Sequence, residues 1–257
     1  MGNSPGLHEV VPREQVGPQT GALYEYQYHQ AAAEALSLLT DETSVCVYCE
    51  WHDDFVSENS SAACYVFHQV KTRIKSKGPW RLTEFFGLAK TKKGQPESAL
   101  DGSSIFAHLW DHTTKFGHKC RRFVFVTDAG IQSDLADFLT EVSTCTAAGQ
   151  LSGPSQIIFQ RVLSQASQTL NGVTNESLFN FLSKLTVGDA VGTVQDLEAV
   201  KLLLANRVYD SSEVDLLISE ARKIGADLVA EVRNRSHRVL ATLPGTTEEL
   251  RQLKGSS

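Results

Sequence analysis

No run of apolar residues in this 257-residue sequence approaches the roughly 20 residues that a membrane-spanning helix requires. The first 21 residues are polar and contain several glycines and prolines, and they lack the apolar core of a secretory signal. We therefore expect no membrane association, a flexible segment over residues 1–20, and a cytoplasmic protein. Charged residues make up 21% of the chain and hydrophobic residues 41%, which is typical of a folded domain and not of a disordered chain.

Cysteine is scarce, and its five positions leave one residue unpaired in any disulfide scheme. Cys46 and Cys49 form a C-x-x-C pair, but no second pair follows to complete a zinc site. The surrounding sequence, SVCVYCE, is typical of a β-strand, in which positions three apart face opposite sides of the sheet. We therefore predict buried free thiols.

Several catalytic signatures are also absent. The chain has no glycine-rich phosphate loop, so we do not expect it to hydrolyse ATP itself, and it has no G-x-S-x-G segment for a serine hydrolase. His108 and His112 lie one turn apart on a predicted helix. The residues between them do not complete an H-E-x-x-H zinc motif, and we interpret both as ordinary helix histidines.

The net charge of −6 conceals a basic segment between residues 66 and 93, which contains eight lysines and arginines and one acid, Glu84. Clustered cations attract a polyanion, and contacts to phosphate need no particular base sequence. The alternative is a solvated charged loop. We favour nucleic-acid binding and assign it to Arg73, Lys75, Lys77 and Lys92.

The first half of the chain predicts alternating helices and strands. Residues 24–40 are rich in alanine and leucine without proline or glycine, which predicts a helix. Residues 44–50 and 63–71 are β-prone, and the polar residues 53–61 between them predict the turn of an antiparallel hairpin.

Further elements complete the pattern of an α/β domain with a mixed central sheet. They are an amphipathic helix over residues 80–90, a helix over 103–116 capped by Ser103 or Ser104, a strand over 122–127, and a helix over 133–145.

The character of the sequence changes after Gly153-Pro154. Residues 156–159 form either a strand or the start of a helix, and most of the chain beyond them has the apolar spacing of helices. We therefore predict a core domain over residues 21–154 and a helical region over 155–257 that serves oligomerisation or partner binding.

One group of residues has the chemistry of a metal-dependent phosphodiesterase. Magnesium prefers oxygen ligands, and Asp54, the side-chain carbonyl of Gln69 and the backbone carbonyl of Val70 can supply them. In a strand, Gln69 and Lys71 share a face, so Lys71 would lie beside the ion and stabilise charge on a phosphate. The alternative is an ordinary surface strand with a solvated Lys71.

The order of these motifs resembles one branch of the PD-(D/E)xK nucleases, whose third motif position is Glu or Gln. The motifs are Tyr26-Gln27 on the first helix, Asp53-Asp54, the sequence QVKTR at 69–73, and WRLTEFF at 80–86. More narrowly, the chain resembles the N-terminal endonuclease domain of CBASS-type bacterial anti-phage effectors. The resemblance covers roughly residues 21–91.

The resemblance implies a restriction-endonuclease-like fold, with a mixed sheet flanked by helices, and cleavage of double-stranded DNA that depends on Mg²⁺, with Mn²⁺ as a substitute. By this resemblance, Asp54 is the metal-binding acid, and Gln69 and Lys71 form the (E/Q)xK element.

Three further positions stay open on the resemblance. The polar position on the first helix, often Glu in the superfamily, is Gln27 here, with Glu25 as the alternative. Asp53 competes with Asp54 for the role of the metal-binding acid. Glu50 is a supporting candidate if its strand continues unbroken to Asp54.

We therefore predict a bacterial DNA endonuclease that acts as an effector in anti-phage defence. Its control is expected to come from homo-oligomerisation, a regulatory sensor or a partner ATPase. The competing hypothesis is a non-catalytic DNA-binding or assembly module of a defence complex.

Overall fold

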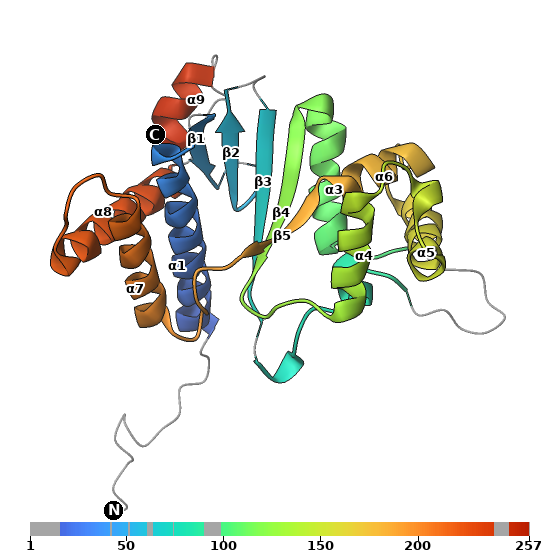
Figure 1. Cartoon of the computed structure of the whole chain (residues 1–257), viewed down its shortest axis with the longest axis horizontal. Helices are drawn as coiled ribbons and strands as arrows, with labels where there is room; N and C mark the ends of the chain where they lie inside the picture. The colour runs from blue at the N-terminus through green and yellow to red at the C-terminus, as the bar shows by residue number, and fades with distance from the viewer. Residues whose placement is uncertain are drawn as a thin grey trace, which may run out of the picture.

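The computed structural model describes residues 16–256 except 42, 51, 61–63, 74, 90–98 and 239–246. Within these residues, six strands form one sheet in the order β5-β4-β3-β2-β1-β6, with helices on both faces (Figure 1). The strands are β1 Ser44–Cys49, β2 Phe55–Asn59, β3 Cys64–Lys71, β4 Cys120–Thr127, β5 Leu185–Asp189 and β6 Gly255–Ser256.

The sheet is mixed, as the sequence predicts. Strands β1, β2 and β3 pair antiparallel in chain order, whereas β4 pairs parallel to both β3 and β5. Helices connect each of the parallel strands, which is the usual crossover between parallel neighbours. The predicted α/β architecture is confirmed.

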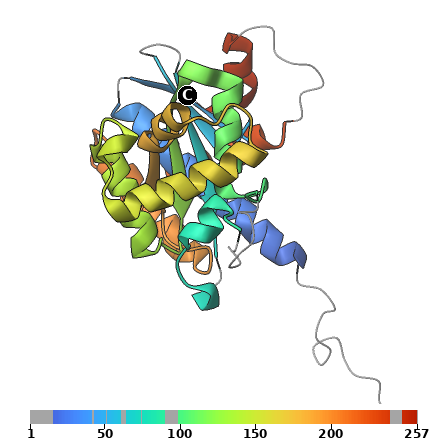
Figure 2. The same ribbon diagram turned by 90° about the vertical axis from the view of Figure 1, so that its right-hand side faces the viewer.

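Three helices cover one face of the sheet, on the left in Figure 1: α1 Val16–Ala35, α7 Leu197–Asp210 and α8 Ile218–Ser236. The other face carries α2 Leu82–Phe86, α3 Ile105–Phe116, α4 Ser133–Thr144, α5 Gly153–Thr169 and α6 Asn175–Ser183. Figure 2 shows α5 lying across the outer side of this second face.

The remaining helices are short. Helix α9, Thr247–Lys254, contacts β1 and β6, and 3₁₀ turns occupy Leu36–Leu39, Lys75–Lys77, Gly117–Lys119 and Ala148–Gln150. None of the helices in the described part of the chain is both long enough and apolar enough to cross a bilayer.

The predicted hairpin between residues 44–50 and 63–71 is wrong in one respect. The segment between them contains a strand of its own, β2, which pairs with both β1 and β3. The sequence did not predict β2, because its polar residues are typical of a turn and their hydrogen-bond partners lie far along the chain. Ser57 donates to Glu34 at 2.8 Å, and Arg251 donates to Glu58 at 2.8 Å.

Most predicted helices are confirmed with shifted ends. The first begins at Val16 instead of residue 24, so the segment predicted to be flexible loses residues 16–20, and residues 1–15 lie outside the description. Helix α3 is capped by Ser104, whose hydroxyl accepts from the Ala107 amide at 3.2 Å. The open segment 156–159 belongs to α5.

The helix predicted over residues 80–90 is shorter, because it ends at Phe86. Gly87 follows in the left-handed conformation, with φ of 67°. A Cβ atom on Gly87 would lie 2.6 Å from Cβ of Ser104 and 2.9 Å from the carbonyl oxygen of Asp101. The close approach of α2 to the start of α3 therefore requires glycine here. Residue 90 lies outside the described residues.

The region after residue 155 is mainly helical, as predicted, but it is not confined to helices. It supplies β5 and β6 to the sheet, and α7 and α8 pack against α1. A boundary at residue 154 stays a prediction, as does the role of this region in assembly.

The cysteine prediction is confirmed. All five cysteines are free thiols, and Cys46, Cys49 and Cys120 are buried. Cys46 packs in the cluster that contains Phe67, whereas Cys49 packs with Phe55 on the opposite face of the sheet. Burial raises the pKa of the Cys46 thiol to about 12, so that thiol stays protonated near neutral pH.

The Gly87 contact predicts the effect of adding a methyl group. Gly87→Ala should destabilise the fold by roughly 1–2 kcal/mol for its left-handed backbone and by roughly 1–3 kcal/mol more for the steric overlap. Gly130→Ala is the matched control, since Gly130 has φ of 66° and no atom within 4 Å of an added Cβ. Urea unfolding measures both, and equal losses would contradict the close contact.

Candidate active site

Asp54 lies immediately before β2, and its carboxylate is held by α1 and β3. Gln27 on α1 donates from Nε2 to Oδ1 at 3.0 Å. On β3, Gln69 donates from Nε2 to Oδ2 at 2.8 Å, and the Val70 amide donates to the same oxygen at 2.6 Å. Residues far apart in the sequence thus converge on one acid.

The packing of α1 explains why Gln27 points at this acid. Tyr26 is fully buried and donates to the Gly192 carbonyl at 3.0 Å. One turn later, Gln30 exchanges two hydrogen bonds with the backbone of Val191, at 3.2 and 2.9 Å. These contacts fix the rotation of α1, and Gln27 then faces Asp54.

The choice between Gln27 and Glu25 is resolved by the same rotation. Two residues along a helix differ by about 200° in direction. Glu25 faces α8, where Arg233 donates to it at 2.7 Å. Gln27 is therefore the residue of α1 that reaches Asp54.

Asp53 and Glu50 are placed differently from Asp54. The Asp53 carboxylate contacts His112 at 2.9 Å and also accepts from the Asp54 amide at 3.0 Å. Glu50 has φ of 49°, so the strand ends at Cys49 and does not continue unbroken. The condition on which Glu50 was a supporting candidate, an unbroken strand to Asp54, is therefore not met, although the Glu50 amide donates to the Asp54 carbonyl at 3.1 Å.

Lys71 is the last residue of β3 and is half-buried. Its side chain has no hydrogen bond or ion pair with the residues that the structure describes. Its positive charge nevertheless acts on Asp54, because it is the strongest of the effects that lower the pKa of this acid. A lysine with no acid in direct contact keeps its ammonium available to an anion.

Burial dominates the electrostatics of Asp54 and raises its pKa above the ordinary range. The charge of Lys71 and the hydrogen bonds from Val70 and Gln69 oppose the rise without cancelling it. Burial therefore leaves the ionised carboxylate less stable here than in water, and a bound cation would offset that cost.

The residues present fit a hard cation. Asp54 offers a carboxylate, and the Gln27 and Gln69 amides each carry an oxygen. Both amides donate to Asp54 in the structure, because a carboxylate only accepts. Turning the Gln69 amide over would direct its oxygen toward an ion. The Val70 carbonyl as a ligand stays a prediction.

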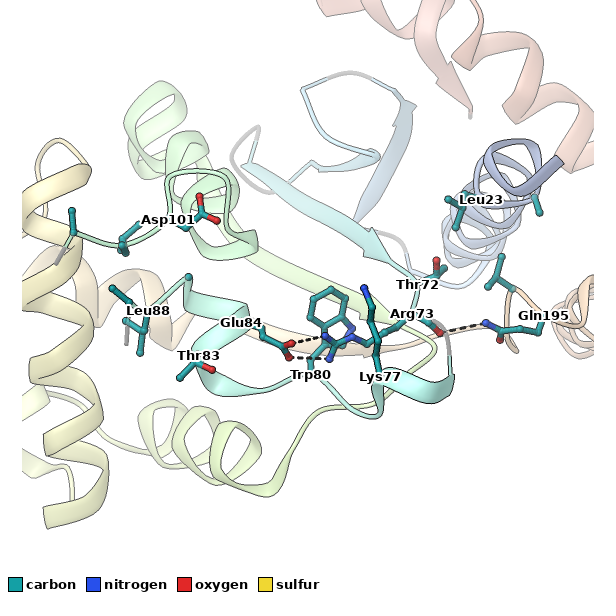
Figure 3. Close-up of a pocket in the computed structure, with 16 residues that line it drawn as sticks. Leu23, Thr72, Arg73, Lys77, Trp80, Thr83, Glu84, Leu88, Asp101 and Gln195 are labelled. Carbon is teal, nitrogen blue, oxygen red and sulfur yellow. Dashed lines mark hydrogen bonds and ion pairs between the residues drawn. The ribbon is translucent and has the colours of Figure 1, made fainter. Parts of the chain in front are cut away.

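A groove of about 1050 Å³ opens next to the end of β3 (Figure 3). Thr72 and Arg73, which directly follow Lys71, form one side of it together with Lys77 and Trp80. Leu23 of α1, one turn before Gln27, also lines the groove. The groove therefore borders the two elements that hold Asp54, although Asp54 and Lys71 are not among its lining residues.

The family model described as "Cap4, dsDNA endonuclease domain" matches residues 15–236. The chain belongs to this family. The predicted relationship to anti-phage endonuclease domains is thus confirmed, and the match extends well beyond the 21–91 segment on which the resemblance was based.

Solved structures similar to this family member include Cap4 SAVED/CARF-domain containing receptors. The receptor from Moraxella osloensis has 13% identity and a TM-score of 0.47, and the match covers 83% of this chain and 43% of that one. The Acinetobacter baumannii receptor with the cyclic trinucleotide 2′3′3′-cAAA has 12% identity and a TM-score of 0.48, covering 88% and 42%. The chain thus spans less than half the length of these receptors. Comparison with curated proteins gave no match.

The four residues predicted to bind nucleic acid have different surroundings. The Arg73 side chain is held in place by two contacts. It donates to both oxygens of Glu84, at 2.9 and 2.7 Å, and its guanidinium lies 4.3 Å from the Trp80 ring centre (Figure 3). Its hydrogen bonds lower the pKa of Glu84. Lys77 is exposed at the groove. The Lys75 side chain and all of Lys92 lie outside the described residues.

Sequence analysis missed the roles of Glu84 and His112. Because Glu84 is the one acid in the basic segment, the sequence did contain a signal that it pairs with a neighbouring cation. His112 occurs on the apolar stripe of α3, between Leu109 and Phe116, which signals a buried position. Nothing in the sequence shows that its partner is Asp53, 59 residues earlier.

The raised pKa of Asp54 predicts a gain in stability when its charge is removed. Asp54→Asn should raise the free energy of unfolding in EDTA at neutral pH, because ionising the buried carboxyl destabilises the native state. The gain should shrink as the pH falls toward the ordinary aspartate value of about 3.9, where the native carboxyl is already protonated.

Asp41→Asn is the opposite control for this measurement. Hydrogen bonds from Thr43 and Ser44 lower the pKa of Asp41 to about 2, so its ionised form stabilises the native state. This substitution should lower stability at neutral pH, and its effect should fade in acid. Urea unfolding over a pH series measures both. A loss of stability in Asp54→Asn at every pH would contradict the dominance of burial.

Proposed function

We propose that this chain is a metal-dependent endonuclease of the PD-(D/E)xK type that hydrolyses phosphodiester bonds in double-stranded DNA. The observation that carries the proposal is a buried carboxylate, Asp54, held by Gln27 and Gln69 next to Lys71. Membership of a double-stranded DNA endonuclease family supports the same conclusion.

The proposed ion is Mg²⁺, with Mn²⁺ as a substitute, bound by Asp54, by the Gln69 side-chain oxygen and by the Val70 carbonyl. No three His, Cys, Asp or Glu side chains cluster as a metal site in the described part of the chain. A single carboxylate is compatible with Mg²⁺, which keeps several waters and takes further oxygens from substrate phosphate. When bound, the ion polarises the phosphate and makes a water more acidic.

Lys71 would stabilise the charge that develops during hydrolysis. The oxygen of a water forms a new bond to phosphorus, the bond to the leaving oxygen breaks, and that oxygen takes up a proton. The phosphate carries its greatest negative charge between these events, and a nearby ammonium lowers the barrier by stabilising it. Lys71 lies two residues after Gln69 on the same face of β3, and this position supports a role beside the scissile group.

The groove beside β3 is the proposed path of the DNA. Lys77 at its edge supplies an exposed cation, and Lys75 and Lys92 remain predicted contributors. Arg73 contributes mainly by holding the wall of the groove, since its charge is matched by Glu84. Phosphate contacts of this kind position the duplex without selecting a sequence.

Lys71→Ala should reduce cleavage of plasmid DNA by about 10²–10³-fold, because it removes a charge that stabilises the transition state. Cleavage by the unaltered protein should require Mg²⁺ or Mn²⁺ and stop in EDTA. Lys115→Ala is the control, since Lys115 is exposed and pairs with Asp111 on the outside of α3. Supercoiled plasmid on an agarose gel gives the rates.

Plasmid that stays intact with either metal would contradict the proposal. If the protein then shifts DNA on a gel in EDTA, and loses this shift when Lys75, Lys77 and Lys92 are neutralised, it is a binding module instead.

We further propose that the chain self-associates through the helical hairpin α7–α8, as the oligomer predicted for an anti-phage effector requires. Large apolar side chains at its tip are strongly exposed, with Val214 and Leu217 each at 68% and Ile218 at 50%. Exposed apolar clusters of this kind mark interaction surfaces.

Replacing both Leu217 and Ile218 by Asp should therefore leave a monomer where the unaltered chain forms a dimer, as measured by light scattering after gel filtration. Ile157→Asp is the control, because Ile157 is 72% exposed on the remote helix α5. A monomeric unaltered chain at high concentration would contradict self-association. Control by a sensor or a partner ATPase stays a prediction.

A further inference from the structure

Asp53 and His112 form a buried pair next to the candidate active site. His112 Nε2 lies 2.9 Å from Asp53 Oδ2, and the two side chains are only 6% and 4% exposed. The pair joins the segment before β2 to α3, on the face of the sheet opposite α1. Polar pairs this deeply buried are costly unless their geometry is well satisfied.

The hydrogen-bond roles within the pair are fixed by chemistry. A carboxylate only accepts, so His112 must carry a proton on Nε2 and donate it to Asp53. The other ring nitrogen, Nδ1, is buried and has no partner among the described residues. Within the described part of the chain, Asp53 is therefore the one hydrogen-bond partner of the His112 imidazole.

The imidazole is also fixed by packing. Phe67 of β3 stacks on it, with ring centres 4.2 Å apart and planes 10° from parallel. Phe116, one turn further along α3, completes the aromatic surroundings at 6.3 Å. This packing fixes the position of the imidazole, which can therefore hold the Asp53 carboxylate in place.

Asp53 passes this restraint to Asp54. Its second oxygen accepts from the Asp54 amide at 3.0 Å, so the same carboxylate holds both α3 and the backbone of the neighbouring acid. Two residues just before it, Glu50 and His52, have φ of 49° and 67°, in the left-handed region. Such backbone is strained by about 1–3 kcal/mol per residue and persists only where contacts enforce it.

We propose that His112 is a positioning residue of the nuclease site, which acts through Asp53 to keep the Asp54 carboxylate directed at the ion. The proposal rests on the metal site proposed above. Partners behind a ligand typically change metal affinity by about 10–100-fold when they are removed. Without the pair, the backbone of Asp54 would become ordered only when the ion binds. The free-energy cost of this ordering would lower the affinity for the ion.

His112→Phe is the informative variant, because phenylalanine keeps the stacking on Phe67 but cannot donate to Asp53. Titration of the protein alone with Mn²⁺, followed by calorimetry, should show affinity weakened by about 10–100-fold. DNA cleavage should recover at high Mn²⁺, unlike that of Lys71→Ala. His112→Gln should restore much of the affinity, since its amide nitrogen stands where Nε2 does. His108→Phe, on the exposed side of the same helix, is the control and should bind Mn²⁺ normally.

A double-substitution cycle tests whether His112 acts through Asp53. Asp53→Asn alone should weaken Mn²⁺ binding, and adding His112→Phe should cause little further loss, because both changes break one link. Additive losses would overturn the proposed route. Should His112→Phe fail to fold in urea unfolding, the comparison of Asp53→Asn with the unaltered protein still decides the matter.

The outcomes separate the two proposals. Equal Mn²⁺ affinity of the unaltered protein, His112→Phe and Asp53→Asn would overturn the positioning role and leave the nuclease proposal intact. Absence of Mn²⁺ binding by the unaltered protein would overturn the metal site, and the positioning role with it.

Discussion

The arrangement of this molecule depends on one buried carboxylate between a helix and a sheet. Asp54 accepts hydrogen bonds from α1 and from β3, and these link the first helix of the chain to the strand that ends in Lys71. The same carboxylate is poorly stabilised as an anion, because burial raises its pKa despite those bonds. A fold optimised only for stability would have an amide or an apolar side chain here. Retaining the acid lowers stability, as active-site residues commonly do, and is what the proposed ion binding would require.

Strand periodicity predicted the part of this site that lies on one strand, and little more. It placed Gln69 and Lys71 on one face, and Val70 between them is buried, as this alternation requires. It also separated Cys46 from Cys49 correctly. It did not extend to Glu50, because a left-handed residue interrupts the alternation and no sequence pattern announces it. It missed β2 because Ser57 and Glu58 find their partners on α1 and α9, at distances along the chain that local propensity cannot sense.

Counting charges identified the basic segment but could not show which charges are available. Arg73 has the right sign and lies close to the candidate site, yet it holds Glu84 and covers Trp80. A bidentate arginine–carboxylate pair is a geometric restraint as much as a charge. It fixes α2 against the end of β3 and so shapes the groove. Lys71 and Lys77, by contrast, have no ion pair with any described residue, so their charges are available for the proposed phosphate contacts.

Asp54 is thus restrained from both faces of the sheet. Gln27 reaches it from the face covered by α1, α7 and α8, and His112 restrains its backbone through Asp53 from the face covered by α3. The two routes act on different atoms, the carboxylate and the amide, so neither can substitute for the other. Helix α1 is itself packed against α7 and α8, the hairpin that exposes apolar side chains at its tip. A partner bound at that hairpin would contact α7 and α8, which pack against the helix that carries Gln27. Helix α1 would therefore connect the proposed assembly surface with Gln27, whereas the contact between His112 and Asp53 reaches Asp54 from the other face of the sheet.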